Sequence, residues 1–152
     1  MLAGERKMTI EISSNQTKLN SGSIHRMLSK VSWSPGITEN EILKGINNSA
    51  LVVGAYTEKG RQIGFLRVVS DKVRFAYFMD VVVDEDCRRQ GIGQQMVNFA
   101  LSHPELKDVY QWLLRTADAH GVYEKCGFKL LENPENWMSI MNPRPDRDDF
   151  TG

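Results

Sequence analysis

An apolar run of this chain passes into an amphipathic run through a short segment that contains glycine and arginine. The apolar run includes Val81–Val83, and the segment after it carries Arg88, Arg89, Gly91 and Gly93. Such a junction suits a phosphate, because the first turn of a helix offers unpaired backbone N–H groups and a partial positive charge. The glycines allow a diphosphate to approach the backbone, and the arginines add fixed charge. The segment is therefore predicted to bind a phosphorylated ligand.

Two familiar phosphate loops do not match this segment. A P-loop needs Lys followed by Ser or Thr, and no such pair follows Gly93. The dinucleotide fingerprint needs a third glycine, and Met96 stands at that place. The predicted ligand is therefore neither a P-loop nucleotide nor NAD.

A second segment, Ala119–Phe128, contains Tyr123 four positions after an alanine and four before a Gly-Phe pair. With this segment, the chain resembles the GNAT (Gcn5-related N-acetyltransferase) superfamily from about Ile24 to Met141. In that family an Arg/Gln-x-x-Gly-x-Gly/Ala turn wraps the pyrophosphate of acetyl-CoA. A later Ala-x-x-x-Tyr-x-x-x-Gly-Phe element brings a tyrosine hydroxyl near the thioester sulfur. The sequence around both motifs is similar to that of a bacterial subgroup whose acceptors are mostly undefined.

The resemblance implies acetyl-CoA as cosubstrate and assigns residues to it. The strand before the turn diverges from its neighbour in this fold, and its backbone groups pair with the pantetheine amides. Thr116 departs from the pattern, because many members carry there an asparagine that contacts the pantetheine arm. The implied cofactor-binding residues are Val81, Val82, Val83, Arg88, Arg89, Gln90, Gly91, Ile92, Gly93, Thr116 and Tyr123.

Amide formation from a thioester requires a neutral amine, a stabilised oxyanion and a proton or hydrogen bond for the departing thiolate. Tyr123 is the predicted acid, because a neutral phenol can donate a hydrogen bond to the thiolate. A tyrosine packed between helix and sheet, with its hydroxyl satisfied locally, is the structural alternative. His120 lies three residues earlier in the sequence and could relay a proton. A histidine on the helix surface is the alternative there.

Asp80 is the third predicted catalytic residue. Alternation with a period of two places it on one strand face with Ala76, Phe78 and Val82, where a carboxylate needs a partner. The partner could be Arg67 or Arg74 in an ion pair across the sheet. Alternatively, the run resembles a strand of spermidine/spermine acetyltransferases in which an aspartate faces the amine, although the glutamate before that aspartate is a methionine here.

Three other side chains could belong to the site. Trp33 and Tyr56 could line an acceptor pocket or pack in the core. Cys87 precedes Arg88, which could lower the pKa of the thiol. The two cysteines and three histidines do not form a metal-ligand pattern, so no metal is predicted.

Length and charge restrict the class of protein. The 152 residues suit one domain, predicted over residues 1–141, followed by a polar, flexible tail over residues 142–152. The 19 basic and 19 acidic side chains cancel, so neither nucleic acid nor a membrane is predicted as a partner. No apolar stretch approaches the roughly 20 residues of a membrane span, and the N-terminal residues do not resemble a secretory signal. A cytoplasmic protein is expected, and a homodimer stays open.

The elements that must position these residues follow from periodicity and capping signals. Ser23 is predicted to cap a first helix, and Thr38 with Glu41 to form a capping box for a second helix, whose apolar face would be Ile42, Leu43 and Ile46. A third helix is predicted from the phosphate turn to His103-Pro104, and a fourth over residues 118–125. Strands are predicted over residues 8–12, 51–56, 63–69, 73–83 and 109–114, with a closing pair over 128–131 and 137–141.

The pattern predicts an α/β (α+β) fold of the GNAT type, with a mixed, mainly antiparallel central sheet flanked by helices. The predicted function is an N-acetyltransferase that moves the acetyl group of acetyl-CoA directly to a primary amine of a small molecule. The alternatives are acetylation of a protein N-terminus or lysine, and a domain that binds acyl-CoA without catalysis.

Overall fold

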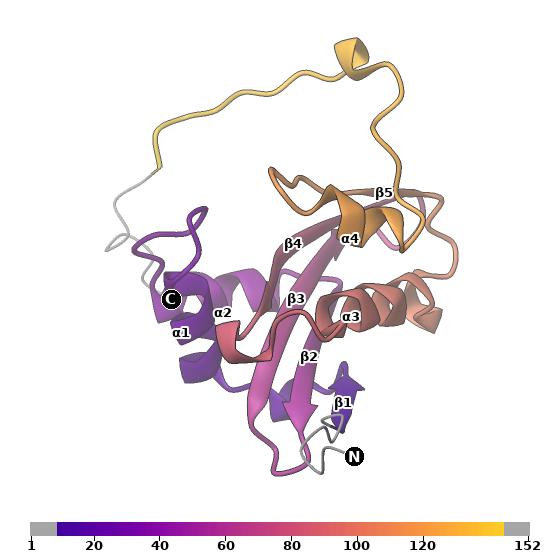
Figure 1. Cartoon of the computed structure of the whole chain (residues 1–152). Coiled ribbons are helices and arrows are strands. Elements are labelled where there is room, and N and C mark those ends of the chain that lie inside the picture. The colour runs from indigo at the N-terminus through magenta and orange to yellow at the C-terminus, as the bar shows by residue number, and fades with distance from the viewer. Residues whose placement is uncertain (1–8, 145–152) are drawn as a thin grey trace.

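A sheet of five strands forms the centre of the structure, a computed structural model that describes residues 9–144 (Figure 1). Each strand is hydrogen-bonded to the strand before it in the chain. The first four are antiparallel neighbours, and the fifth runs parallel to the fourth. The predicted mixed, mainly antiparallel sheet is confirmed. The strands are β1 (Ile10–Ser13), β2 (Leu51–Thr57), β3 (Gln62–Ser70), β4 (Phe75–Val83) and β5 (Gln111–Leu113).

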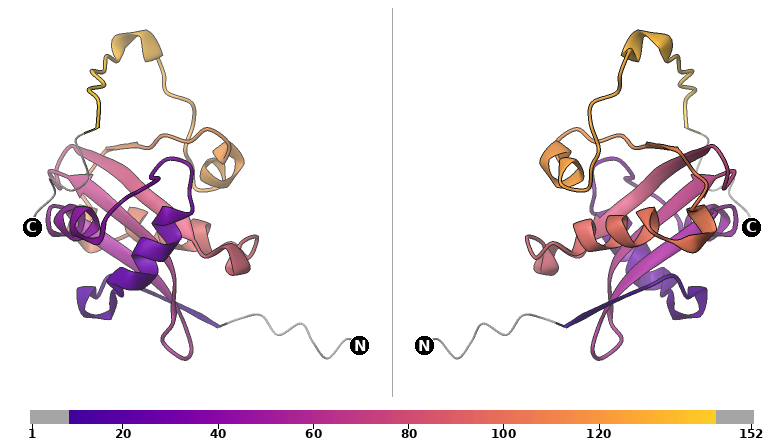
Figure 2. Two further views of the ribbon diagram at one scale, coloured as in Figure 1. Left: turned by 90° about the vertical axis from the view of Figure 1, so that its left-hand side faces the viewer. Right: turned by 90° about the vertical axis from the view of Figure 1, so that its right-hand side faces the viewer.

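Helices cover both faces of this sheet, as Figures 1 and 2 show. One face carries α1 (Ser21–Ser29) and α2 (Glu39–Asn47), and the other carries α3 (Ile92–Leu101) and α4 (His120–Glu124). The structure thus has three layers with an apolar core on each side of the sheet. No helix within residues 9–144 is both long enough and apolar enough to cross a membrane.

Side-chain caps begin the first two helices. The Thr38 hydroxyl accepts a hydrogen bond from the backbone N–H of Glu41 at 3.2 Å, which confirms the predicted start of α2. The predicted cap of α1 is wrong, because Asn20 takes that place and its side chain accepts from the N–H of Ser23 at 2.8 Å. Leu43 is 43% exposed, so it does not belong to the buried face of α2.

A β-bulge interrupts β4 at Asp80. Phe65 of β3 pairs with Val82 and Arg67 pairs with Met79, so two residues of β4 lie opposite one residue of β3. Asp80 has a φ of 57°, in the left-handed region that aspartate and asparagine tolerate better than most residues. The predicted common face is therefore wrong. The side chain of Val82 packs toward α1 and α2, whereas that of Phe78 packs toward α3.

The fourth and fifth strands separate soon after they meet. β5 pairs with β4 only from Phe75 to Tyr77. Beyond Tyr77, the side of β4 that faces β5 has no strand partner among the described residues. The second half of β4 therefore has an open edge beside α3 and α4.

The predicted closing strand pair is absent. Neither residues 128–131 nor residues 137–141 form a strand. Residues 129–144, here called the C-terminal arm, instead leave the end of α4 and pass over the sheet at a distance toward the loop after α1 (Figures 1 and 2). The prediction was wrong because a strand needs a hydrogen-bonded neighbour, and the arm runs apart from the sheet and pairs with none of the described strands. Most of the predicted tail, residues 145–152, lies outside the described residues.

Candidate active site

The turn before α3 has the geometry of an anion site. Gly91 is the N-cap of α3, with a φ of 75°, and no side chain caps the helix. The first intrahelical bond joins the N–H of Gln95 to the carbonyl of Gly91 at 3.0 Å. The N–H groups of the preceding helical residues point out of the helix end without an intrahelical acceptor. A Cβ on Gly91 would meet nothing within 4 Å, so this glycine is required for its backbone angle, not for space in the chain itself.

The predicted side chains of the turn divide into exposed and buried groups. Arg88, Arg89 and Gln90 are exposed around the helix end, and Arg88 donates from Nε to the carbonyl of Val83 at 3.4 Å. Ile92 is only 2% exposed and packs in the core, so only its backbone can face a ligand. Gly93 has no crowded neighbour, because its added Cβ would lie 3.8 Å from Val83.

Asp84 anchors the turn to the rest of the fold. Its Oδ2 atom accepts from Arg61 at 2.9 Å and from Arg26 of α1 at 3.2 Å, and its Oδ1 atom accepts from the N–H of Asp86 at 3.3 Å. Burial by itself raises the pKa of Asp84, but the Asp86 N–H and the two guanidinium groups outweigh it, and the net shift is downward. The carboxylate therefore stays ionised and tied to both arginines.

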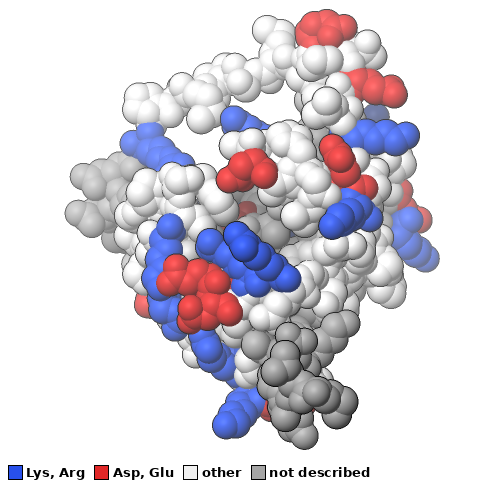
Figure 3. All heavy atoms as spheres, viewed as in Figure 1, with Lys and Arg blue, Asp and Glu red and all other residues white. Residues whose placement is uncertain are grey.

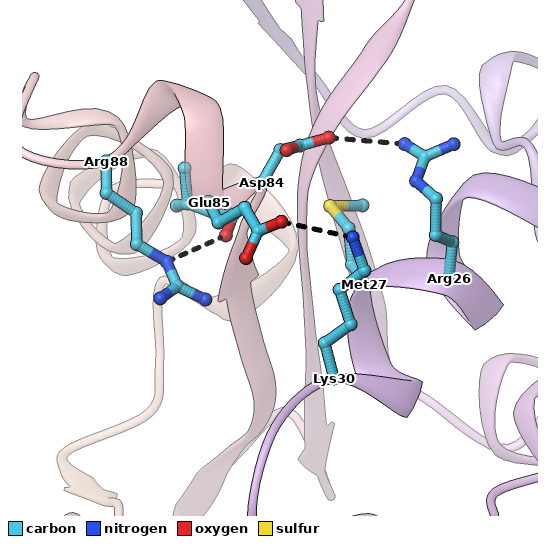
Figure 4. Close-up of a pocket in the computed structure, with 7 residues that line it drawn as sticks. Arg26, Met27, Lys30, Asp84, Glu85 and Arg88 are labelled. Carbon is cyan, nitrogen blue, oxygen red and sulfur yellow. Dashed lines mark hydrogen bonds and ion pairs between the residues drawn. The ribbon is translucent and has the colours of Figure 1, made fainter.

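A small pocket between α1 and the turn carries these ion pairs (Figure 4). Beside the contact between Arg26 and Asp84, Lys30 Nζ lies 3.2 Å from Glu85 Oε1. Figure 3 shows basic and acidic side chains side by side on the face that it presents. These contacts hold α1 against the turn. They therefore link α1, on one face of the sheet, to the turn that leads into α3 on the other face.

Cys87 contradicts the sequence-based interpretation. It is 3% exposed, and burial, followed by the charge of Asp84, raises the pKa of its thiol. The adjacent Arg88 donates to the carbonyl of Val83 and is not among the charges that act on the thiol. Cys87 is a buried residue of the short helix Glu85–Cys87.

Val81, Val82 and Val83 lie on the open half of β4. Val81 and Val83 pack against the core below α3, and Val82 packs against the core below α1. All three side chains are used for packing. What remains for a ligand is the backbone of the open edge.

Tyr123 lies in α4, beside this edge. Its ring packs against the core, with its centroid 6.1 Å from that of Phe128 in an edge-on contact. Burial, followed by the nearby Cys126 and Asp118, raises the pKa of Tyr123. Its hydroxyl has no hydrogen bond to another described residue. The local partner that the structural alternative required is thus not found within residues 9–144.

Thr116 and His120 lie at the start of the segment that carries Tyr123. The Thr116 hydroxyl accepts a hydrogen bond from the N–H of Ala119 at 3.0 Å, just before α4. This contact positions the start of α4, which carries Tyr123. His120 is the exposed first residue of α4, three residues before Tyr123.

Asp80 forms an ion pair with Arg67, one of the two partners that the sequence suggested. Its Oδ2 atom lies 2.7 Å from Nε of Arg67, and both side chains are about 15% exposed: 16% for Asp80 and 15% for Arg67. Arg74 is not the partner, since it donates to the hydroxyl of Tyr110 at 3.0 Å. The second oxygen of Asp80, Oδ1, has no hydrogen-bond donor among the described residues.

The two aromatic residues proposed for an acceptor pocket differ in exposure. Tyr56 is 2% exposed in β2 next to β1, with a pKa raised to about 12, chiefly by burial. It is a core residue. Trp33 is 50% exposed in the loop between α1 and α2, and its carbonyl accepts from Arg144 at the end of the arm at 2.6 Å.

Comparison with known proteins identifies the family. Residues 48–130, which include the turn, β5 and α4, match the acetyltransferase (GNAT) domain. The chain belongs to the GNAT family. A GNAT-family protein from Xanthomonas campestris pv. campestris is 33% identical, with a TM-score of 0.82, and the match covers 89% of this chain and 94% of that one. The protein is thus an acetyltransferase by family.

Solved structures of lower identity share the fold alone. A Staphylococcus aureus protein of unknown function is 21% identical, with a TM-score of 0.70 over 88% of this chain and 100% of that one. Glucosamine-6-phosphate N-acetyltransferase from Arabidopsis thaliana is 19% identical, with a TM-score of 0.62 over 90% of this chain and 98% of that one. No curated protein sequence matches the chain.

The residues of this GNAT protein fit acetyl-CoA. The uncapped start of α3, the two exposed arginines and the open edge of β4 belong to one stretch of chain that runs from strand to helix. Two residues were not predicted from the sequence. Asp84 fixes the turn. Gly45 of α2 leaves room for the guanidinium of Arg67, which would lie 3.1 Å from a Cβ added at Gly45. The acidic run after the valines was a usable signal for Asp84. Gly45 had no local signal.

Proposed function

We propose that the protein is an acetyl-CoA-dependent N-acetyltransferase that acetylates a primary amine of a small molecule by direct transfer. The observation that carries this proposal is the uncapped N-terminus of α3 next to the open half of β4, with Tyr123 in α4, whose hydroxyl bonds to no residue within 9–144. The start of α3 suits a diphosphate, the open edge of β4 suits a chain of amides, and the hydroxyl of Tyr123 suits a reacting group.

The turn and the strand hold the cosubstrate in this proposal. The N–H groups of Ile92 and Gly93 and the charges of Arg88 and Arg89 bind the diphosphate, and Gln90 lies between them. Backbone groups of Val81–Val83 pair with the amides of the pantetheine arm. When bound, acetyl-CoA supplies an activated thioester carbonyl and a thiolate leaving group. One N–H of this strand would also donate to the developing oxyanion.

Tyr123 is proposed as the donor to the leaving group. Its raised pKa keeps the phenol protonated at neutral pH, and its hydroxyl has no competing partner among the described residues. A phenol of this kind stabilises a thiolate by donating a hydrogen bond even without complete transfer of the proton. Thr116 supports this role because its hydroxyl accepts a hydrogen bond from the N–H of Ala119, the residue just before α4.

Asp80 is proposed to receive the amine. A lysine-like amine has a pKa of about 10.4, so removing its proton at about pH 7 costs roughly 4 to 5 kcal/mol. Arg67 binds one carboxylate oxygen of Asp80 and leaves the other available for the ammonium group. Asp80 would then orient the amine or accept its proton. His120, exposed at the start of α4, could pass a proton to bulk water.

The test has a binding arm and a turnover arm. Calorimetric titration should show binding of CoA and acetyl-CoA but not of ATP or NAD. Incubation with acetyl-CoA and pooled amines, followed by detection of free thiol, should show amine-dependent release. Binding without release under any amine would reduce the function to acyl-CoA binding. Absence of CoA binding would reject the proposal.

A further inference from the structure

Arg67 and Asp80 form an ion pair that uses only part of their hydrogen-bonding capacity. Nε of Arg67 donates to Oδ2 of Asp80 at 2.7 Å. The remaining N–H donors of the guanidinium sit on its terminal nitrogens, and these donate to no described residue. Oδ1 of Asp80 accepts no hydrogen bond within residues 9–144 either. The pair therefore presents unused donors beside an unused acceptor.

The unused atoms of this pair are open to a ligand. Within residues 9–144, the Tyr56 hydroxyl is the one buried side-chain nitrogen or oxygen that lacks a hydrogen-bond partner. The unpaired atoms of Arg67 and Asp80 are therefore not buried, although these side chains are only 15% and 16% exposed. Partly buried charges are screened by salt less than charges on an open surface, so a ligand charge that meets them is held more strongly.

The backbone fixes both charges in place. Asp80 stands in the β4 bulge with a φ of 57°, and Arg67 lies opposite Met79 on β3. Gly45 of α2 lies against the guanidinium, since a Cβ added there would be 3.1 Å from Cζ of Arg67. A larger residue at this point of α2 would have to displace the guanidinium. The pair is thus a preorganised arrangement of a cation and an anion.

This arrangement matches a ligand that carries the opposite charges side by side. An α-amino acid is such a ligand, because a single carbon atom joins its ammonium and carboxylate groups. Its ammonium group would donate to Oδ1 of Asp80, and its carboxylate would accept from the terminal nitrogens of Arg67. A simple amine would satisfy Asp80 alone and leave the donors of Arg67 to water.

The neighbouring side chains on this face of the sheet are largely apolar. Met79 pairs with Arg67, and the next pair on the same face is Val69 with Tyr77. These residues alternate with Phe78, which packs toward α3, so they lie on the face that carries α1 and α2. Val69 is 38% exposed, and Tyr77 and Met79 are half-buried. An apolar side chain of the ligand would pack against this surface.

We propose that the acceptor is a free α-amino acid with an apolar side chain, bound by the pair of Arg67 and Asp80. This inference rests on the proposed acetyl transfer and names its substrate class. The transfer forms an amide bond at the amino nitrogen and breaks the C–S bond of the thioester. The amino acid in its ammonium form and acetyl-CoA thus give the N-acetyl amino acid, the CoA thiol and one proton. Arg67 contacts the carboxylate and determines specificity.

The first experiment compares acceptors that differ only in the carboxylate. Leucine and isopentylamine share the amine and the apolar side chain, as do phenylalanine and phenethylamine. With acetyl-CoA and detection of free thiol, kcat/KM should be about 100-fold higher for each amino acid than for its amine, because only the amino acid satisfies Arg67. Equal values, or a preference for the amines, would overturn the inference and leave acetyl transfer to a small amine standing.

Arg67→Gln and Arg67→Lys test the contact with the carboxylate. The preference for the amino acid should fall to near unity in Arg67→Gln, whereas Arg67→Lys should retain part of it, since lysine keeps the charge without the planar fork. The preference is a ratio within one protein, so a loss of folded protein does not alter it. An unchanged preference in Arg67→Gln would overturn the inference.

Arg74→Gln is the matched control. Arg74 is an exposed arginine just before β4, and its Nε donates to the hydroxyl of Tyr110 at 3.0 Å. Its replacement should leave the preference at the wild-type value. A preference that collapses in Arg74→Gln as well would show that the general charge of the protein, and not Arg67, selects the amino acid.

A binding experiment separates this inference from the proposed function. Leucine and isopentylamine are titrated calorimetrically into the full chain with and without CoA, so that no acetyl group can be transferred. Tighter binding of leucine, weakened in Arg67→Gln, supports the inference even if no amine is acetylated, and that result would reject only the transfer. Equal binding of the two ligands, or no binding of leucine, would overturn the inference whatever the turnover.

Discussion

The cofactor half and the reacting half of the candidate site are built in different ways. The cofactor half is one stretch, Val81–Gly93, in which strand, turn and helix follow one another. The reacting half combines Asp80 at a bulge, Arg67 on the adjacent strand and Tyr123 on a helix far along the chain. A contiguous binding unit can be read from the sequence, whereas a reacting group assembled from distant elements depends on packing. The following changes should separate the two halves.

Tyr123→Phe should have the largest effect, and only on turnover. The ring keeps its packing against Phe128, but the donor to the thiolate is lost. We expect turnover to fall by roughly 10- to 1,000-fold with CoA affinity nearly unchanged, measured by thiol release and calorimetry. Tyr110→Phe, at an exposed tyrosine outside the site, is the control. Unchanged turnover in Tyr123→Phe would assign the acid to water or another group.

Asp80→Asn tests the reacting half for both stability and acceptor use. Asparagine tolerates the left-handed backbone at this position, so the change isolates the charge. Loss of the ion pair leaves Arg67 partly buried without its partner and should lower the free energy of unfolding by about 3 kcal/mol.

The same variant should also use amine acceptors poorly while binding CoA normally. Arg67→Gln/Asp80→Asn should recover part of the stability without recovering acceptor use. If the double variant regains both, or if Asp80→Asn has wild-type acceptor kinetics, Asp80 serves the sheet alone.

Gly91→Val tests the cofactor half. Valine is strained at a φ of 75°, and its branched side chain would stand at the uncapped helix end. CoA at 100 times its dissociation constant should stabilise the wild type by about 2.7 kcal/mol, and most of this gain should vanish in the variant. Gly60→Val, at another left-handed and open glycine in the β2–β3 turn, should keep it. Equal loss in both variants would point to backbone strain instead of the site.

Asp84→Asn should have the smallest effect and a defined pH dependence. The folded-state pKa of Asp84 lies below its unfolded value of about 3.9, so its contribution to stability is present above that pH and is lost as the pH falls through the lower folded pKa.

At neutral pH the variant should lose about 1 kcal/mol, because Arg26 and Arg61 are each about half exposed and can be solvated. Denaturant unfolding between neutral and acid pH should show a shallower slope than the wild type below about pH 4. An identical slope in both proteins would remove Asp84 from the acid response.

Two apolar runs differ in how well the sequence predicted their strand pairing. Val81–Val83 and residues 137–141 both have the pattern of strands, but only the first pairs within the described chain. Its neighbour, β3, precedes it through a short turn, so pairing is local and was predictable. The arm would have to pair with β5 across α4 and a redirected loop, and the sequence carries no signal for that choice.

The sequence by itself determined the central strands, the start of α2 at Thr38, the turn before α3 and the position of Tyr123 in α4, because periodicity, caps and glycine angles act over a few residues. Only the tertiary structure decided that Asp80 sits in a bulge against Arg67, that Asp84 joins α1 to the turn, and that the arm leaves its own sheet. Each of these depends on which distant group occupies the neighbouring space, and that is settled by packing of the whole chain.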